Sequence, residues 1–210
     1  VFVPPHHNDL SVLLSDLENF WHSESPIPYL IRVAISHYQF ETIHPFLDGN
    51  GRIGRLLIIL QLISYKLLEK PVLYLSDFLE KNRTQYYDSL ERVRAQDSLD
   101  QWLRFFLTGV IQSSQKSKET FIQIGLLREK YAKRITKLGR RSQLAKTLLE
   151  SLYSSPIISP RETEKKLDVA PATANRLLKS MESIGVLKEK TGFSRNRFYE
   201  LHEYLDIFRE

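Results

Sequence analysis

The sequence contains no cysteine. Disulfide bonds and thiolate metal sites are therefore excluded within this chain, and a cytoplasmic setting is favoured. No stretch of about 18 uncharged apolar residues is present, which is the length that a membrane-spanning helix needs. The most apolar run, residues 56–63, is interrupted by Gln61 and flanked by Arg55 and Lys66. It predicts a buried helix, and we expect no membrane partner.

The chain also lacks the features of a secretory leader. Residues 1–5 read Val-Phe-Val-Pro-Pro, without the charged and apolar regions of a signal peptide. The first residue is not methionine. We therefore expect this sequence to begin inside a longer natural protein.

The net charge of +5 is unevenly distributed. Residues 1–111 carry a net charge of −3, residues 112–146 carry +8, and residues 147–210 carry zero. The basic excess therefore belongs to a connecting segment and not to either flanking region.

Apolar residues recur at helical spacing along most of the chain, which predicts a mainly α fold. The run near residue 60 is apolar on nearly all sides, so its helix is expected at the centre of a helical bundle. In this first region we predict helices over approximately residues 10–21, 28–43, 52–69, 82–95, 98–114 and 121–138.

The predicted elements become shorter from residue 142 onward. Three short helices are predicted there, over residues 144–152, 160–167 and 172–184, followed by strands at 186–187 and 197–199 around a polar hairpin at 190–196. This order is typical of a small winged helix-turn-helix domain with a short β-hairpin. We expect a helical domain over residues 1–114, a connecting basic helix over 115–141, and the winged domain over 142–210.

A glycine-rich turn at residues 48–52 leads directly from one predicted helix into the next. Such a turn can aim several backbone N–H groups at one anion, and the helix dipole favours negative charge there. Gly49 and Gly51 are expected to supply positive φ angles and close approach without a Cβ clash. The alternative is a plain turn between helices, because Asp-Gly and Asn-Gly are common turn dipeptides.

Two arginines follow this turn. Arg52 and Arg55 lie three residues apart on one face of the first helical turn. Cations at a helix N-terminus oppose the helix dipole, at a cost of about 0.3–1 kcal/mol each. Their presence favours a bound polyphosphate. Alternatively, they pair with nearby carboxylates, namely Glu41, Asp48 or Asp77. Gly54 lies between them, and a glycine inside a helix indicates a closely packed neighbour.

Asp48 and His44 are the candidate metal ligand and proton acceptor at this turn. Asp48 offers a hard oxygen ligand, and Mg²⁺ usually takes one or two carboxylates together with substrate phosphates. His44 stands four residues earlier, and an imidazole can accept a proton from a hydroxyl near neutral pH. The alternatives are a turn-capping role for Asp48 and a structural role for His44.

The twelve residues from His44 to Arg55 resemble the complete signature of the Fic family. They read His-Pro-Phe-Leu-Asp-Gly-Asn-Gly-Arg-Ile-Gly-Arg, against the pattern His-x-Phe-x-Asp/Glu-Gly-Asn-Gly-Arg-x-x-Arg, with no departure. Residues 34–42, 83–87 and 102–110 also resemble Fic proteins, so the resemblance covers about residues 1–111. It implies that the first domain is a Fic-type helical bundle.

The resemblance implies a protein adenylyltransferase, which moves AMP from ATP to a Ser, Thr or Tyr hydroxyl of a target protein or of itself. His44 would be the catalytic base, and Asp48 would hold Mg²⁺. The implied nucleotide-binding residues are Gly49, Asn50, Gly51, Arg52, Ile53, Gly54 and Arg55, with Tyr86 or Tyr87 bordering the adenine.

Family members also differ among themselves. Doc-like members transfer phosphate and carry lysine where this chain has Gly51, so AMP transfer is favoured here. Many Fic enzymes are restrained by a helix with the motif Ser/Thr-x-x-x-Glu-Gly/Asn. The pair Glu18-Asn19 has Leu14 at the Ser/Thr position, so the motif is missing, as is the flap that usually precedes the Val-Pro-Pro segment. We expect both upstream, in a parent enzyme that restrains itself.

The third helix of the winged domain is the candidate recognition helix for DNA. Its small and polar residues Thr173 and Asn175 suit base edges. Basic residues suited to phosphates are Arg176, Lys179, Arg195 and Arg197. Because the region has zero net charge, it can equally be a protein-binding or homodimer module. A second hypothesis is thus a DNA-binding regulator whose Fic domain binds nucleotide without catalysis, but the intact His44 favours the enzyme.

Overall fold

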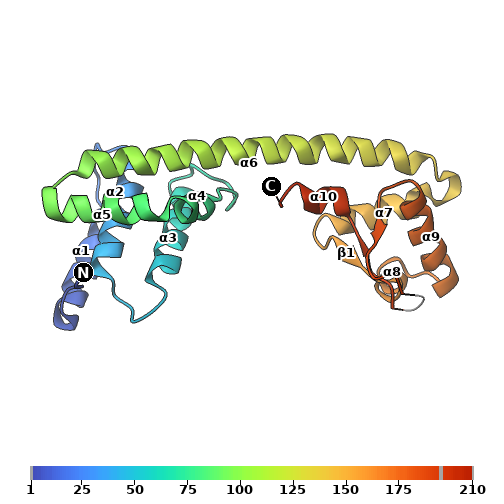
Figure 1. The fold of residues 1–210 in the computed structure, drawn as a ribbon, viewed down its shortest axis with the longest axis horizontal. Helices are drawn as coiled ribbons and strands as arrows, with labels where there is room; N and C mark the ends of the chain where they lie inside the picture. The colour runs from blue at the N-terminus through green and yellow to red at the C-terminus, as the bar shows by residue number, and fades with distance from the viewer. Residues whose placement is uncertain (1, 194–195, 210) are drawn as a thin grey trace. The chain divides into compact units, whose positions relative to one another are not determined.

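The computed structural model describes residues 2–193 and 196–209. The chain divides into two compact units, Val1–Ser117 and Lys118–Glu210. Helices dominate both units, so the predicted mainly α fold is confirmed (Figure 1). The boundary between the units falls inside the predicted connecting segment, residues 115–141.

The first unit is a helical bundle, coloured blue to green in Figure 1. Its elements are η1 (His7–Asp9), α1 (Leu10–His22), α2 (Tyr29–Ile43), α3 (Asn50–Ser64), α4 (Leu75–Lys81), α5 (Arg83–Gln96) and the first part of α6 (Leu99–Thr136). Helix α2 packs on both α1 and α3. The short connection between α2 and α3 therefore lies between two well-packed helices.

Trp102 anchors the core of the first unit. Its side chain is fully buried, and its Nε1 donates a hydrogen bond to the backbone oxygen of Ala34 over 2.9 Å. This bond ties α6 to α2 while the indole packs with Phe106 among the buried apolar side chains of α2 and α3. Apolar burial of this kind is the main stabilising contribution in a helical bundle, and here it fixes the two helices that flank the 44–49 loop.

Helix α6 departs from the prediction. The sequence predicted separate helices over 98–114 and 121–138, but a single helix runs from Leu99 to Thr136. The residues between the predicted helices, 115–120, are polar but contain neither glycine nor proline. Nothing in them breaks the backbone hydrogen bonding, because a gap in apolar periodicity marks exposure and not the end of a helix.

Two further expectations for the first unit were incomplete. The helix predicted over 52–69 ends at Ser64, and Lys66 then adopts a left-handed conformation with φ 57°. Helix α4 was not predicted at all. Its seven residues are too few for a clear helical period in the sequence.

The second unit combines helices with a small antiparallel sheet. Its elements are the end of α6, η2 (Gly139–Arg141), α7 (Ser142–Leu152), β1 (Ile157–Ile158), α8 (Pro160–Leu167), α9 (Pro171–Ser183), β2 (Lys188–Glu189), β3 (Tyr199–Glu200) and α10 (His202–Asp206). The strand order is β1-β3-β2, and both Ile157 and Lys188 pair with Glu200. The predicted short β-hairpin is confirmed as β2 and β3.

The hairpin strands lie one to two residues later than predicted. Val186 and Leu187, the predicted first strand, are instead fully buried core residues before β2. Strand β1 and helix α10 were not predicted, since two and five residues give no usable periodicity. Within this unit, α6 contributes Leu127, Tyr131 and Ile135 to the core formed with α7 and α9.

Ser159 forms a capping box that starts α8. Its Oγ accepts a hydrogen bond from the backbone N–H of Glu162 over 3.3 Å, and its own N–H donates to Glu162 Oε2 over 2.7 Å. The Ser159 hydroxyl also donates to Glu162 Oε2 over 2.8 Å. The backbone bond and then this hydroxyl bond to the carboxylate lower the pKa of Glu162. A carboxylate with a lowered pKa stabilises the fold above its unfolded pKa, and this contribution is lost as the pH falls through the folded pKa.

We predict that Ser159→Ala lowers the free energy of unfolding by about 1 kcal/mol at neutral pH, because one cap hydrogen bond is lost. Urea denaturation followed by far-UV circular dichroism measures this effect. The difference from wild type should shrink as the pH falls below the unfolded pKa of a glutamate. The exposed Ser155→Ala is the matched control; an equal effect of both substitutions would remove the capping explanation.

Candidate active site

His44 occupies the point where α2 ends. It is the C-cap residue in a left-handed conformation, with φ 49° and ψ 55°, and its backbone N–H donates to Phe40 O over 2.9 Å. A non-glycine residue in this region carries roughly 1–2 kcal/mol of backbone strain, and such strain concentrates at functional sites. The half-buried imidazole is thus placed immediately before the glycine-rich loop.

Asn50 closes the loop. It is the first residue of α3 and is 2% exposed. Its Oδ1 accepts a hydrogen bond from the backbone N–H of Phe46 over 2.9 Å, and its Nδ2 donates to the backbone oxygen of Phe46 over 2.5 Å. The Asn50 side chain thus binds both the N–H and the carbonyl oxygen of Phe46. These two bonds define the shape of the loop at the N-terminus of α3.

The two glycines of the loop serve different purposes. Gly49 is the N-cap of α3 with φ 88°, as expected for a positive φ. Gly51 lies inside the first turn of α3 and is not among the glycines with positive φ, so this part of the expectation was wrong. A Cβ on Gly51 would lie 3.2 Å from Nη1 of Arg55. Gly51 therefore leaves room for the close approach of Arg55.

Arg52 is paired with Asp48. Its Nη2 lies 3.1 Å from Asp48 Oδ2, and the two side chains are 74% and 91% exposed. Pairs this exposed contribute little to stability, about 0–1 kcal/mol. A polyanion could displace Asp48 from Arg52 at little cost. The alternative pairing with Asp77 was wrong, because Asp77 binds lysines of α4 and α6 instead.

A buried polar layer lies beneath the first turns of α3. His37 is fully buried, and its Nε2 is 2.9 Å from the hydroxyl of Tyr86. Burial lowers the pKa of His37 to about 4, so the ring is neutral at physiological pH. Glu41 belongs to the same layer, and burial raises its pKa. The sequence indicated Glu41 only as one alternative partner for the arginines, and its burial was missed.

The two tyrosines expected near the nucleotide are placed differently. Tyr86 is 4% exposed and belongs to the core, whereas Tyr87 is 54% exposed. Tyr87 lines a cavity of about 470 Å³ together with Phe2 and Arg94. The ring centroid of Phe2 lies 6.0 Å from that of His44, and the guanidinium carbon of Arg94 lies 3.8 Å from the Phe2 centroid. The cavity is therefore separated from His44 by one aromatic ring.

Asp48 is the candidate ligand for a divalent cation at this loop. Among residues 2–193 and 196–209, no three or more His, Asp or Glu side chains gather as a metal site would require. Asp48 is a single exposed carboxylate, and its Oδ1 accepts the N–H of Gly49 over 2.7 Å. One carboxylate suits Mg²⁺ only where substrate phosphates complete the shell. The residues thus fit Mg²⁺ in the company of a bound polyphosphate.

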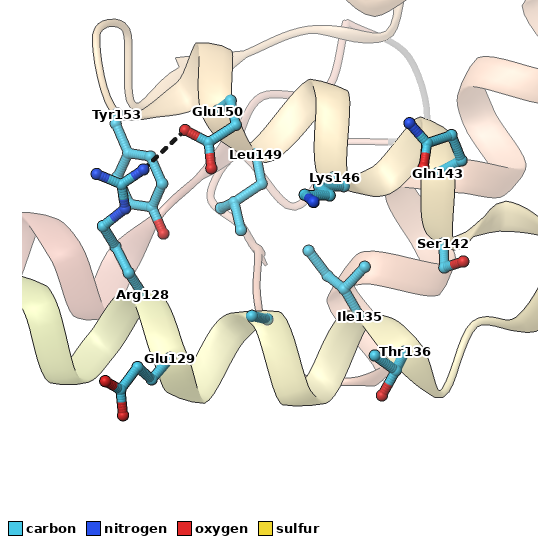
Figure 2. Close-up of a pocket in the computed structure, with 11 residues that line it drawn as sticks. Arg128, Glu129, Ile135, Thr136, Ser142, Gln143, Lys146, Leu149, Glu150 and Tyr153 are labelled. Atoms are coloured by element: carbon cyan, nitrogen blue, oxygen red, sulfur yellow. Dashed lines mark hydrogen bonds and ion pairs between the residues drawn. The ribbon is translucent and has the colours of Figure 1, made fainter.

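A second cavity, of about 430 Å³, lies between the end of α6 and α7 in the second unit (Figure 2). Ile135 and Leu149 point toward one another in it, as Figure 2 shows. At its edge, Arg128 binds Glu150 over 2.9 Å and covers the ring of Tyr153 at 4.7 Å. This arginine is already engaged by two partners. The cavity contains none of the residues predicted to act in catalysis.

The candidate DNA-contacting residues of the second unit are largely exposed. Four of them lie on the surface of α9, namely Thr173, Asn175, Arg176 and Lys179. Arg197 is half-buried, and its Nε donates to the backbone oxygen of Phe193 over 2.8 Å. Arg195 lies outside the described residues.

None of the helices in the described part of the chain combines the length and apolar character that crossing a membrane requires.

Comparison with known proteins relates the first unit to one family. Residues 1–62 match the profile of the Fic/DOC family. The chain is 30% identical over 127 residues to Protein adenylyltransferase Fic of Drosophila grimshawi, covering 57% of this chain and 23% of that protein. It is 36% identical over 96 residues to Protein adenylyltransferase Fic of Aedes aegypti, covering 42% of this chain and 17% of that protein. The chain therefore spans less than a quarter of the length of these relatives.

A solved structure shares the fold. A Fic family protein from Desulfovibrio desulfuricans G20 superposes with a TM-score of 0.52 at 20% identity, covering 94% of this chain and 56% of the other. At this identity the similarity concerns the fold alone.

We predict that Asn50→Ala lowers the free energy of unfolding of the first unit by about 1–3 kcal/mol, because both backbone groups of Phe46 lose their partner. Both tryptophans, Trp21 and Trp102, lie in this unit, so urea denaturation followed by tryptophan fluorescence reports on it. Leu47→Ala, at a fully exposed loop position, is the control. Identical midpoints for the two variants would contradict a closing role for Asn50.

Proposed function

Since residues 1–62 match the Fic/DOC family, we propose that this chain carries the catalytic domain of a protein adenylyltransferase. It moves AMP from ATP to a Ser, Thr or Tyr hydroxyl of a target protein or of the enzyme itself. The names of the relatives support this class of reaction. One observation carries the proposal. His44 lies directly before the glycine loop, and in the helix that follows the loop the Arg55 side chain folds back over Gly51.

The N-terminus of α3 is the proposed phosphate site. The first N–H groups of a helix lack intrahelical partners and favour anions, and here they belong to Asn50, Gly51 and Arg52. Arg52 and Arg55 bind the β- and γ-phosphates. Gly49, with its positive φ, starts the helix. Ile53 and Gly54 belong to the same turns, and Gly54 packs against α2. Of the two tyrosines, Tyr87 borders the adenine, supported by its exposure and by the cavity that it lines.

His44 is the proposed base of the reaction. It accepts the proton of the acceptor hydroxyl while the hydroxyl oxygen forms a bond to the α-phosphorus of ATP. The bond from the α-phosphorus to the oxygen bridging to the β-phosphate breaks, and pyrophosphate leaves. The protein contributes mainly position and charge stabilisation to such a displacement.

Asp48 would hold Mg²⁺ at the phosphates, which is consistent with its single, exposed carboxylate. When bound, the ion supplies positive charge to the phosphate oxygens. Asp48 must then release Arg52, and the exposed geometry of that pair makes the exchange easy.

Gly51 supports transfer of AMP over transfer of phosphate. The guanidinium of Arg55 lies 3.2 Å from the position that a Cβ would take there. A longer side chain at this position, such as the lysine of Doc-like proteins, would displace Arg55. A glycine leaves this space to Arg55 and to the nucleotide.

We also propose that the second unit is a winged helix-turn-helix module that binds duplex DNA through α9. The order α7, β1, α8, α9, β2, β3 and the sheet order β1-β3-β2 support this assignment. The exposed Thr173, Asn175, Arg176 and Lys179 on α9 support the choice of helix. A protein-binding module is the alternative outcome of the test below.

We predict that His44→Ala reduces AMP transfer by about 10²–10⁴-fold, the usual contribution of a general base. The affinity for ATP should stay unchanged, because the phosphate site is intact. The measurement follows label from α-labelled ATP into protein, with the protein purified in its full natural length. His22→Ala, at an exposed position on α1, is the matched control. Equal labelling by wild type and His44→Ala would disprove the role of His44 as base.

We predict that Arg176→Ala weakens DNA binding and lowers the slope of log affinity against log salt by about 1, because one phosphate contact is lost. Electrophoretic mobility shifts at several salt concentrations measure both quantities. The control is Arg104→Ala, an exposed arginine of the first unit. If wild type shifts no DNA even at low salt, the second unit is a protein-binding module.

A further inference from the structure

Glu41 presents a carboxylate inside the protein beneath the phosphate site. It lies on α2, one helical turn before His44, and is 6% exposed. Within the described part of the chain, its buried Oε1 has no hydrogen-bond partner. Leaving a buried polar atom unpaired is unfavourable by about 1–3 kcal/mol, and by more for a charged group. The unpaired Oε1 of Glu41 therefore destabilises the fold. The proposed reaction gives this oxygen no direct role.

The space for this carboxylate comes from Gly54. A Cβ on Gly54 would lie 2.5 Å from Glu41 Oε1 and 3.2 Å from a carbon of the His37 ring. Real side chains do not approach so closely, so any other residue at position 54 would push the carboxylate away. The absence of a Cβ at Gly54 of α3 thus makes room for the buried oxygen of Glu41 on α2.

The same oxygen lies near the place where Arg55 folds back over α3. The Cβ position of Gly51 lies 4.0 Å from Glu41 Oε1 and 3.2 Å from Arg55 Nη1. The carboxylate and the guanidinium therefore both lie near one point on the first turn of α3. Glu41 is buried there, and Arg55 is half-buried.

Three cationic or basic side chains affect the pKa of Glu41 through their charge. Burial raises its pKa most strongly, whereas His44, Arg55 and Arg94 each lower it and so favour the charged form. Arg94 is already fixed elsewhere, because its Nε donates to Thr42 Oγ1 over 3.3 Å and its guanidinium covers the ring of Phe2. His44 acts more strongly on Glu41 than Arg55 does, but its place is set by the C-cap of α2. Arg55 is therefore the cation on α3 that the carboxylate can position.

We propose that Glu41 is a positioning residue: its buried carboxylate attracts the Arg55 guanidinium without a hydrogen bond to Oε1, and so favours the position of this side chain against Gly51, where the β- and γ-phosphates of the nucleotide are bound. This inference rests on the proposed function of the site. An arginine that is already ordered loses less conformational entropy when it binds its anion, so binding is tighter. Glu41 acts only through Arg55 and does not touch the nucleotide.

The test is a double-mutant cycle on nucleotide affinity. Isothermal titration with ATP and with AMP is performed on wild type, Glu41→Gln, Arg55→Ala and the double variant. Glu41→Gln should weaken ATP binding by about tenfold, within the usual range for coupled contacts. AMP binding should not change, because AMP lacks the β- and γ-phosphates. In the Arg55→Ala background, Glu41→Gln should have no further effect.

This expectation is opposite to that of simple electrostatics. Removing a negative charge near a polyanion strengthens its binding. Tighter ATP binding by Glu41→Gln would therefore overturn the proposal. So would additive effects in the cycle, or equal weakening of ATP and AMP, which a general loss of structure would produce.

Two further variants serve as a second test and as a control. Gly54→Ala keeps the carboxylate but forces it from its place, so it should reproduce the tenfold loss for ATP even if Glu41→Gln folds poorly. Glu18→Gln makes the same chemical change at an exposed position of α1 and should leave both affinities unchanged. If wild type binds no ATP, the proposed function fails as well. If wild type binds ATP but the cycle is additive, only the assignment of Glu41 fails.

Discussion

The close packing of α2 against the first turns of α3 is the constraint on which the site depends. Glycine at position 54 leaves room for an oxygen of Glu41, which a Cβ would displace. Glycine at position 51 leaves room for the Arg55 side chain, which folds over it. With both helices held by the apolar core around Trp102, the helix N-terminus and the backbone of His44 are in place before any ligand arrives. Preorganisation of this kind is what phosphoryl and nucleotidyl transfer require from a protein.

The chemical residues of the loop could be proposed from the sequence because the signature from His44 to Arg55 is contiguous. The mainly α fold also followed from periodicity. The arrangement behind the loop could not be found in this way. Glu41 is an ordinary glutamate in a helical pattern, and only tertiary packing shows that its carboxylate is buried under Gly54. Tyr86 and Tyr87 are adjacent in sequence, yet packing buries one and exposes the other.

The errors in the fold have a common physical origin. Polar residues 115–120 interrupt the apolar period but not the backbone hydrogen bonds, so two predicted helices are one. Helix α4, strand β1 and helix α10 are short, and tertiary contacts stabilise them more than local propensity does. Val186 and Leu187 suggested a strand because they are apolar, but their burial belongs to the core, and the strand follows them.

The central claim is that the first turn of α3 binds the phosphates of ATP beside His44. A crystal structure with a non-hydrolysable ATP analogue and Mg²⁺ tests it most directly. The account predicts phosphate oxygens on the backbone N–H groups of residues 50–52, the α-phosphorus near the imidazole, and Asp48 released from Arg52. A well-ordered nucleotide bound elsewhere, with the pair of Asp48 and Arg52 intact, would contradict it.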